Sequence, residues 1–430
     1  MSYRKPKIII IGAGFAGLRA LANLKSVRAE ILLIDRNSYH TFVPLLYQVA
    51  TGFIPPKTVA YPLSKVLDSY GNARFLTAEV LTVDFQQKLV TTDRESLTYD
   101  YLVIATGSKT KFLGVAGAFQ YTYPLRTLTD AVLLRDRIFS NLKLAVTCDD
   151  KQQKQKLLTF TIVGGGATGV ELAGALAESI QAAIAQKYPQ LASQQIRILL
   201  IHAQNRLLAD FPPHLGQYTA RQLRQRGIEL YLATRVSSVT REAVQLDNGE
   251  LIDTATVIWT AGVAANFPNH SQEIAITKSH KIPVRSTLQL LDYPEVYGVG
   301  DVAYVQQKEA PLLGIAPEAI QQGTTVGKNL QRQIQGLAPK SFNYFNKGTA
   351  AIIARNAGVA YLFGKIPLQG FMAWLLWLGI HLYYLPGLRS RWLVCQSWLQ
   401  DYFKRQRNLE PIFSRLDRTY PQPQETSSHN

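Results

Sequence analysis

Three glycines near the amino terminus have the spacing of a phosphate-binding turn. Gly12, Gly14 and Gly17 follow the apolar run Ile8–Ile11, and the next apolar run ends on Asp35, 18 residues after the third glycine. Glycines let backbone amides approach a pyrophosphate at the positive end of a helix, and a carboxylate after the second strand can accept a hydrogen bond from a ribose hydroxyl. The pattern predicts a dinucleotide site, against the alternative of an ordinary strand-to-helix turn.

The same pattern returns later in the chain. Gly164, Gly166 and Gly169 follow a second apolar run and precede an alanine-rich helical stretch, which predicts a second nucleotide. The strand after this turn ends on His202 instead of an acid. A carboxylate there would repel the 2′-phosphate of NADP, so His202 favours tolerance of that phosphate, against the alternative of a structural histidine.

Shorter motifs mark where other strands break near a bound group. Thr106 and Gly107 end one apolar strand, Gly262 ends another, and Asp301 closes a Tyr-Gly-Val-Gly-Asp turn. Small residues at a strand end let the backbone come close to a ligand. We therefore expect all four residues to contribute to cofactor binding.

The elements that must position these residues predict an α/β protein with two Rossmann-like dinucleotide-binding domains. We expect the first domain to be split over residues 1–118 and 276–340, and the second to cover 119–275. A membrane-associating region of amphipathic helices is expected at 341–418, and a disordered tail at 419–430. The polar stretch 148–156 is expected to be a linker, and the alternation in 74–90 predicts a small antiparallel sheet.

Composition limits the function classes. The chain has 430 residues, 47% of them hydrophobic, which allows two or three domains with filled cores. The chain has two cysteines, Cys148 and Cys395, and this scarcity is typical of a reducing compartment and argues against disulfide scaffolds and zinc clusters. The two are far apart and form no C-x-x-C or C-x4-C dithiol that could pass electrons from a flavin to a disulfide. The first residues, MSYRKPK, contain no apolar run, so no targeting segment is expected.

Part of the excess positive charge lies beside the apolar run near the end of the chain. The net charge is +16, and from Lys340 onward 11 Lys and Arg face 4 Asp and Glu. Between Lys365 and Arg389, 23 residues carry no charge, but prolines and glycines interrupt them. A helix lying in the membrane surface is favoured, with Trp374 and Trp377 as interfacial residues. A buried core or dimer helix and a true membrane span are the alternatives.

An aromatic stretch follows the first nucleotide motif. Residues 37–56 contain Phe42 and Tyr47 in a run without clear periodicity. The run favours a ligand wall, against the alternative of a surface connection.

Two nucleotide sites without a redox cysteine pair favour a flavin on the first site and a nicotinamide on the second, with hydride transfer between them. The membrane-type end favours a lipid-soluble quinone as final acceptor. The chain resembles the single-subunit, non-proton-pumping type II NAD(P)H:quinone oxidoreductases on the motifs IGAGFAGL, FVPLLYQVATG, YDYLVIATGS, GGGATGVELAGAL, GVGD, APEAIQQG and QGFMAWLLWLGIHLYYLPGLRSRWLV.

This resemblance implies roles for individual residues. The first glycine turn with Asp35, Thr106, Gly107 and Asp301 would bind FAD tightly, and the second would bind NADH or NADPH. Glu171 would be a catalytic acid near the nicotinamide, with a helix-start carboxylate as its alternative. Gln321 and its neighbour Gln322 would face the quinone, although many members of the family carry glutamine where Pro317 stands. No calcium-binding insertion is visible, and no metal is expected.

The implied protein is a peripheral membrane enzyme at the cytoplasmic face of a bacterial-type plasma or thylakoid membrane. Its expected partners are a quinone, the lipid surface and, through the C-terminal helices, a second copy of the chain, with no nucleic acid. A soluble reductase of a small redox protein and a non-catalytic nucleotide-sensing flavoprotein are the alternatives. A sulfide:quinone oxidoreductase would need catalytic cysteines that Cys148 and Cys395 are not spaced to supply.

Overall fold

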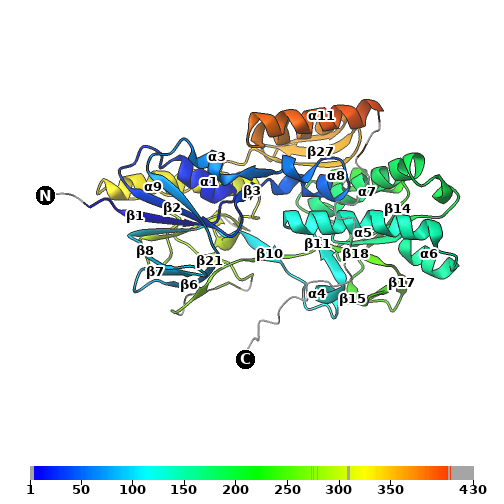
Figure 1. The fold of residues 1–430 in the computed structure, drawn as a ribbon, viewed down its shortest axis with the longest axis horizontal. Helices are drawn as coiled ribbons and strands as arrows, with labels where there is room; N and C mark the ends of the chain where they lie inside the picture. The colour runs from blue at the N-terminus through cyan, green and yellow to red at the C-terminus, as the bar shows by residue number, and fades with distance from the viewer. Residues whose placement is uncertain are drawn as a thin grey trace.

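The structure is a computed structural model that describes residues 4–272, 274, 276–277, 279–307, 310–404 and 407. Two lobes lie side by side, and the C-terminal helix α11 (Leu388–Lys404) crosses one side of the molecule above strand β27 (Ala357–Leu362) (Figure 1).

Five parallel strands form the sheet of the first lobe. Except in the edge strand at residues 73–77, their central residues are buried because helices cover one face and a second sheet covers the other. Successive isoleucines on the central strand point to opposite faces of the sheet. Ile8 and Ile10 pack toward the helices, and Ile9 and Ile11 pack toward the second sheet. In spatial order the strands are β22 (Val296–Gly298), β9 (Tyr101–Ile104), β1 (Lys7–Ile11), β2 (Glu30–Asp35) and β5 (Ala73–Thr77).

The second lobe repeats this arrangement. Its sheet is also parallel, and in spatial order its strands are β11 (Thr122–Pro124), β18 (Thr256–Trp259), β12 (Thr159–Val163), β13 (Arg197–His202) and β14 (Ile228–Leu232). The two central strands, β1 and β12, are the ones followed by the glycine turns. The carboxyl ends of parallel strands meet at one edge, so this topology places each turn at the edge where α/β proteins bind ligands.

Helices and smaller sheets cover both lobes. The smaller sheets are β20-β6-β7-β8 on the first lobe (Asn269–His270, Val80–Asp84, Leu89–Thr92, Ser96–Thr98) and β15-β16-β17 on the second (Val236–Val239, Ala243–Leu246, Leu251–Asp253). The α-helices before the C-terminal region are α1 (Phe15–Ala22), α2 (Leu46–Ala50), α3 (Leu63–Leu67), α4 (Ala118–Tyr121), α5 (Leu128–Thr147), α6 (Lys151–Leu157), α7 (Ala167–Gln186), α8 (Pro213–Arg224) and α9 (Ala316–Ile334). Short 3-10 turns lie at Val43–Leu45, Pro56–Thr58, Pro189–Leu191 and Gly300–Val302.

Two antiparallel strands connect the lobes. The chain leaves the first sheet through β10 (Ser108–Thr110) and returns through β19 (Val263–Ala265), which pair with each other. The remaining strand pairs are β3 (Tyr39–Thr41) with β4 (Ala60–Pro62), β21 (Ile282–Pro283) with β23 (Ala303–Tyr304), and β24 (Gln306–Gln307) with β25 (Ala310–Pro311).

The C-terminal region packs on the second lobe. A three-stranded antiparallel sheet, β26 (Thr349–Ala354), β27 and β28 (Ile366–Gly370), precedes α10 (Phe371–Tyr384) and α11. Trp377, Leu385 and Val394 of this region are fully buried in the same core as α5 and α7. The inner faces of the terminal helices are therefore part of the folded body.

The α/β class with two Rossmann-like units is confirmed. The expected polar linker at 148–156 is wrong, because α6 occupies Lys151–Leu157 and Asp150 caps it by accepting hydrogen bonds from the amides of Gln152 and Gln153. The antiparallel sheet expected in 74–90 is confirmed for β6 and β7, whereas residues 73–77 join the parallel sheet as β5. The tail at 419–430 lies outside the described residues.

The aromatic stretch is not a surface connection. Phe42 is 2% exposed and Tyr47 is 4% exposed, and α2 packs against α5 and α7. The alternative of a surface connection is wrong because the apolar side chains that interrupt the sequence pattern are core residues.

Candidate functional site

The first glycine turn contains two glycines that the protein itself requires and one that it does not. A Cβ on Gly12, whose φ is +100°, would lie 2.4 Å from the carbonyl oxygen of Ala105, and a Cβ on Gly17 would lie 1.9 Å from that of Gly12. Gly14 has an ordinary φ of −75°, and no described protein atom lies within 4 Å of its Cβ position. The open space beside Gly14, at the start of α1, fits an anionic group bound by the helix amino terminus.

Asp35 lies beside this turn. Its Oδ2 accepts a hydrogen bond from the Ala13 amide at 2.7 Å, and its Oδ1 accepts one from the Asn37 amide at 2.8 Å. These bonds fix the carboxylate at the ligand-binding edge of the sheet. The remaining lone pairs could accept hydrogen bonds from a ribose diol.

The strand break after β9 presents an unsatisfied polar atom. Thr106 Oγ1 is buried and has no hydrogen-bond partner among the described residues. Gly107 has a φ of +70° and open space at its Cβ position. A buried hydroxyl without a partner costs free energy, so a polar ligand atom beside Thr106 would remove a penalty.

Asp301 belongs to a cluster that includes a residue missed by the sequence analysis. Its Oδ2 accepts hydrogen bonds from Ser108 Oγ at 2.6 Å and from the Arg126 guanidinium at 2.5 Å. Arg126 also donates to Ser108 Oγ. The turn before Asp301 is held by Gln322, whose Oε1 accepts from the Gly300 amide at 2.6 Å. Arg126 precedes the capping residue of α5, and no spacing in the sequence connects it with a carboxylate 175 residues away.

The second turn reproduces the first. A Cβ on Gly164, whose φ is +118°, would lie 2.7 Å from Thr260 Oγ1, and a Cβ on Gly169 would lie 1.8 Å from the carbonyl oxygen of Gly164. Gly166 again has no described atom within 4 Å of its Cβ position. The other predicted glycine, Gly262, has a φ of +76° and accepts a hydrogen bond from the Lys111 amide at 3.2 Å between β10 and β19.

His202 occupies the place in the second lobe that Asp35 occupies in the first. Its Nδ1 accepts a hydrogen bond from the Gly165 amide at 3.0 Å, as Asp35 accepts from Ala13. Burial lowers the pKa of His202, so the imidazole is neutral at pH 7 and its hydrogen is on Nε2. A Cβ on Gly165 would lie 2.6 Å from Leu207 Cδ2 and 2.7 Å from the Cγ of His202. Glycine at 165 therefore makes room for both the imidazole and the Leu207 side chain.

Glu171 lies on the first turns of α7, beneath the C-terminal region. It is 8% exposed, and its Oε1 accepts hydrogen bonds from Trp377 Nε1 at 3.0 Å and from the Ile352 amide at 3.3 Å. Burial raises its pKa to about 8, although both hydrogen bonds act in the opposite direction. The carboxyl group is thus suited to hold and release a proton near neutral pH.

Aromatic side chains connect the surroundings of the two turns. Phe15, the residue after Gly14, packs edge-on against Phe42 at 5.6 Å between ring centroids, and Phe42 packs against His381 of α10 at 6.3 Å. The ring of His381 stacks on Trp377 at 3.7 Å, and Trp377 donates to Glu171. Helix α10 therefore lies between the first glycine turn and Glu171.

The side-chain carboxamides of Gln321 and Gln322 both form hydrogen bonds with backbone groups. The Gln321 carboxamide donates to the carbonyl oxygen of Phe345 and accepts from its amide, each at 2.9 Å. Pro317 lies in the first turn of α9, where proline is well tolerated. The structure thus gives both glutamines a role in holding local backbone.

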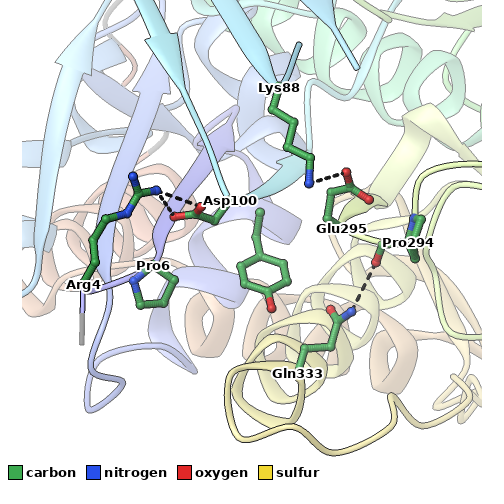
Figure 2. Close-up of a pocket in the computed structure, with 8 residues that line it drawn as sticks. Arg4, Pro6, Lys88, Asp100, Pro294, Glu295 and Gln333 are labelled. Atoms are coloured by element: carbon green, nitrogen blue, oxygen red, sulfur yellow. Dashed lines mark hydrogen bonds and ion pairs between the residues drawn. The ribbon is translucent and has the colours of Figure 1, made fainter. Parts of the chain in front are cut away.

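A separate pocket lies away from these turns. Its volume is about 470 Å³, and it lies at the amino ends of β1 and β9, beside Tyr101 and Pro294. Figure 2 shows that its charged side chains pair with each other, Arg4 with Asp100 and Lys88 with Glu295. These pairs leave little unbalanced charge to bind a ligand. Among the described residues, no group of three or more His, Cys, Asp or Glu could hold a metal ion.

The outer faces of α10 and α11 are apolar and exposed. Leu388 is 81% exposed and Trp392 is 64% exposed, and a groove of about 400 Å³ runs between the two helices beside Cys395. The other exposed apolar side chains of these helices are Phe371, Met372, Leu375, Tyr383, Leu399 and Phe403. No described helix combines the length and apolar character needed to cross a bilayer.

Comparison with known proteins gives a consistent result. Residues 6–323 match the pyridine nucleotide-disulphide oxidoreductase family. The chain is 32% identical over 419 residues to the type II NADH:quinone oxidoreductase Ndh of Mycobacterium tuberculosis, a match covering 94% of this chain and 89% of that protein. It is 28% identical over 379 residues to the type II NADH:quinone oxidoreductase of Staphylococcus aureus, covering 86% of this chain and 92% of that protein.

A solved structure shares the fold. The structure of NDH2 from Plasmodium falciparum in complex with NADH matches with a TM-score of 0.86 at 20% identity, covering 93% of this chain and 99% of that one.

Proposed function

Because the chain belongs to the type II NADH:quinone oxidoreductases, within the pyridine nucleotide-disulphide oxidoreductase family, we propose that it oxidises NADH and reduces a membrane quinone. The observation that carries the proposal is the open space at the Cβ positions of two glycines, Gly14 and Gly166. Neither the backbone conformation nor the packing of the protein requires glycine at these two positions. Two ligands that approach the backbone closely supply a reason for both.

The residues of the first lobe fit an FAD. Gly14 leaves room for its pyrophosphate, Asp35 can accept from its ribose, and the unpaired Thr106 Oγ1 is available to a polar atom of the ligand. Asp301, held by Arg126, can accept from the ribityl hydroxyls. Bound FAD would supply the two-electron carrier between nicotinamide and quinone.

The residues of the second lobe fit NADH and, we propose, also NADPH. Gly166 leaves room for the pyrophosphate, and Gly262 belongs to the break beside it. The neutral imidazole of His202 does not repel a 2′-phosphate, and its Nε2–H can donate a hydrogen bond to either a hydroxyl or a phosphate oxygen. The enzyme is therefore expected to use both nucleotides.

Glu171 is the proposed proton-carrying residue. Quinone reduction consumes two protons, and a carboxyl group with a pKa of about 8 holds a proton at pH 7 and can release it. Gln321 and Gln322 contribute by fixing Phe345 and the turn before Asp301. The buried stretch around Phe42, which packs against His381 of α10, is the proposed ligand wall.

The exposed faces of α10 and α11 are the proposed membrane contact, on the cytoplasmic side. Exposed Leu388 and Trp392 are interfacial types, and Arg389 between them can meet anionic headgroups. The inner faces are fixed to the body: Arg355 pairs with Asp401 at 2.9 Å. The same exposed faces could instead pair two copies of the chain, which the mass in solution with and without lipid would distinguish.

Purified protein tests the function directly. Oxidation of NADH and of NADPH is followed separately with a short-chain quinone as acceptor. Turnover that requires both the nucleotide and the quinone supports the proposal. A bound flavin that neither nucleotide reduces would overturn it.

A further inference from the structure

Both hydrogen bonds to Glu171 fall on the same oxygen. Trp377 Nε1 and the Ile352 amide donate to Oε1, at 3.0 Å and 3.3 Å. No other described residue donates to or accepts from the Glu171 carboxyl group, and Oε2 is not among the fully buried unpaired atoms. Since two donors already fill the lone pairs of Oε1, the proton of the neutral acid belongs on Oε2.

The fold fixes each of these donors. Gly174, one turn after Glu171, lets β26 approach α7, because a Cβ there would lie 1.6 Å from the carbonyl oxygen of Ile353. This close approach brings the Ile352 amide onto the carboxyl group. A larger residue at 174 would move β26, and with it the amide, away from Glu171.

The indole of Trp377 is also held from several sides. It is fully buried, with the ring of Tyr47 at 6.2 Å and that of Trp398 at 6.2 Å. His381 stacks on it at 3.7 Å, and His381 Nδ1–H donates to the carbonyl oxygen of Trp377 at 2.8 Å. The Nε1–H therefore has one available direction, toward Glu171.

We propose that Trp377 is a positioning residue for Glu171: its indole N–H holds Oε1 as an acceptor, so that Oε2 is the oxygen that gains and loses the proton. The inference rests on the proposed function for what the proton does, since a proton on Oε2 is the one available to the quinone reaction. It also makes α10 part of the active site rather than only a membrane-facing element.

The expected effect on titration has a defined sign. A hydrogen bond to the charged form stabilises the carboxylate, so removing the Trp377 donor raises the pKa of Glu171 further above its present value of about 8. The other titratable groups around it are Tyr47 on α2, Glu178 further along α7 and His381 behind the indole. Burial raises the pKa of Tyr47 and lowers that of His381 to about 4, so both are neutral near pH 8.

The test compares two tryptophans that each donate one indole hydrogen bond into the body. Trp377→Phe removes the donor to Glu171, and Trp398→Phe removes a donor to Gln48 Oε1, which does not titrate. The pH dependence of NADH:quinone turnover is measured in the flavin-loaded full chain. Loss of one charge-assisted bond is expected to move the Glu171 titration up by about one pH unit in Trp377→Phe and to leave it unchanged in Trp398→Phe.

A second readout does not depend on turnover. The infrared band of the protonated carboxyl group is titrated without nucleotide or quinone, and Glu171→Gln identifies the band. An upward shift in Trp377→Phe alone supports the proposal, whereas an unchanged titration overturns it. If Trp377→Phe does not fold, benzothienylalanine at 377 keeps the ring shape and replaces N–H by sulfur. Absence of NADH:quinone turnover in the parent protein would overturn the proposed function, while the infrared titration would still decide the role of Trp377.

Discussion

Replacing His202 by aspartate should make the enzyme discriminate against NADPH. His202→Asp places a carboxylate oxygen where Nδ1 now accepts from the Gly165 amide, which copies the bond between Asp35 and Ala13 in the first lobe. A 2′-phosphate bound about 5 Å away carries close to two negative charges. Each charge pair costs roughly 0.8 kcal/mol in water and roughly 3 kcal/mol at an effective dielectric constant of about 20.

His202 is only partly buried, so the lower part of this range applies. The expected loss of kcat/KM for NADPH relative to NADH is about tenfold to a hundredfold. The assay is steady-state oxidation of each nucleotide with the same short-chain quinone. His202→Asn is the matched control, because it has the same shape as the aspartate without the charge, and it should keep the parent ratio. A ratio in His202→Asp that stays within about threefold of that in His202→Asn would refute the electrostatic reasoning.

Three further predictions follow from the same geometry. Gly14→Ala should abolish flavin absorbance and Gly166→Ala should raise KM for NADH by about tenfold or more, both without lowering the melting temperature of the flavin-free protein, whereas Gly17→Ala, whose Cβ would lie 1.9 Å from a carbonyl oxygen, should lose the fold itself. Glu171→Gln should stabilise the protein increasingly as the pH rises: the folded-state pKa is raised to about 8 from 4.5, so the cost of ionising the buried acid is absent below pH 4.5 and complete above pH 8. Melting temperatures of parent and variant should then differ by a few degrees at pH 8 and by little at pH 5, and a difference independent of pH would contradict the assignment. Leu388→Glu with Trp392→Glu should reduce co-sedimentation with anionic vesicles, whereas Leu251→Glu, at a leucine on β17 that is 63% exposed, should not; equal binding by both variants would count against the α10 and α11 contact.

The sequence predicts those parts of the fold that depend on residues close together in the chain. Apolar strands before the glycine turns and the second copy of the motif predict both parallel sheets, because strand, turn and helix are neighbours in the chain. Helix α6 was missed because it is polar all round, so it has no apolar period, and its capping aspartate is the one local sign of its start.

Contacts between distant residues could not be predicted in the same way. Trp377 and Glu171 are 206 residues apart, and Arg126 and Asp301 are 175 apart. No repeating sequence pattern links the two members of either pair. The C-terminal tryptophans illustrate the difficulty, because composition alone indicates interfacial residues, whereas Trp377 is fully buried and Trp392 is largely exposed. Only the packing of α10 and α11 on the second lobe separates the two.

The fit between Gly165 and His202 restricts the order in which this turn can accumulate mutations. With the imidazole in place, alanine at 165 would put its Cβ 2.7 Å from the ring, so Gly165→Ala is harmful in the present background. His202→Asp would not remove the obstacle, because Leu207 Cδ2 would still lie 2.6 Å from the Cβ of alanine at 165. The alanine and aspartate pair found at 13 and 35 therefore requires a change at 207 as well. Nucleotide preference can change through residue 202 alone, whereas position 165 stays glycine until both of its neighbours have changed.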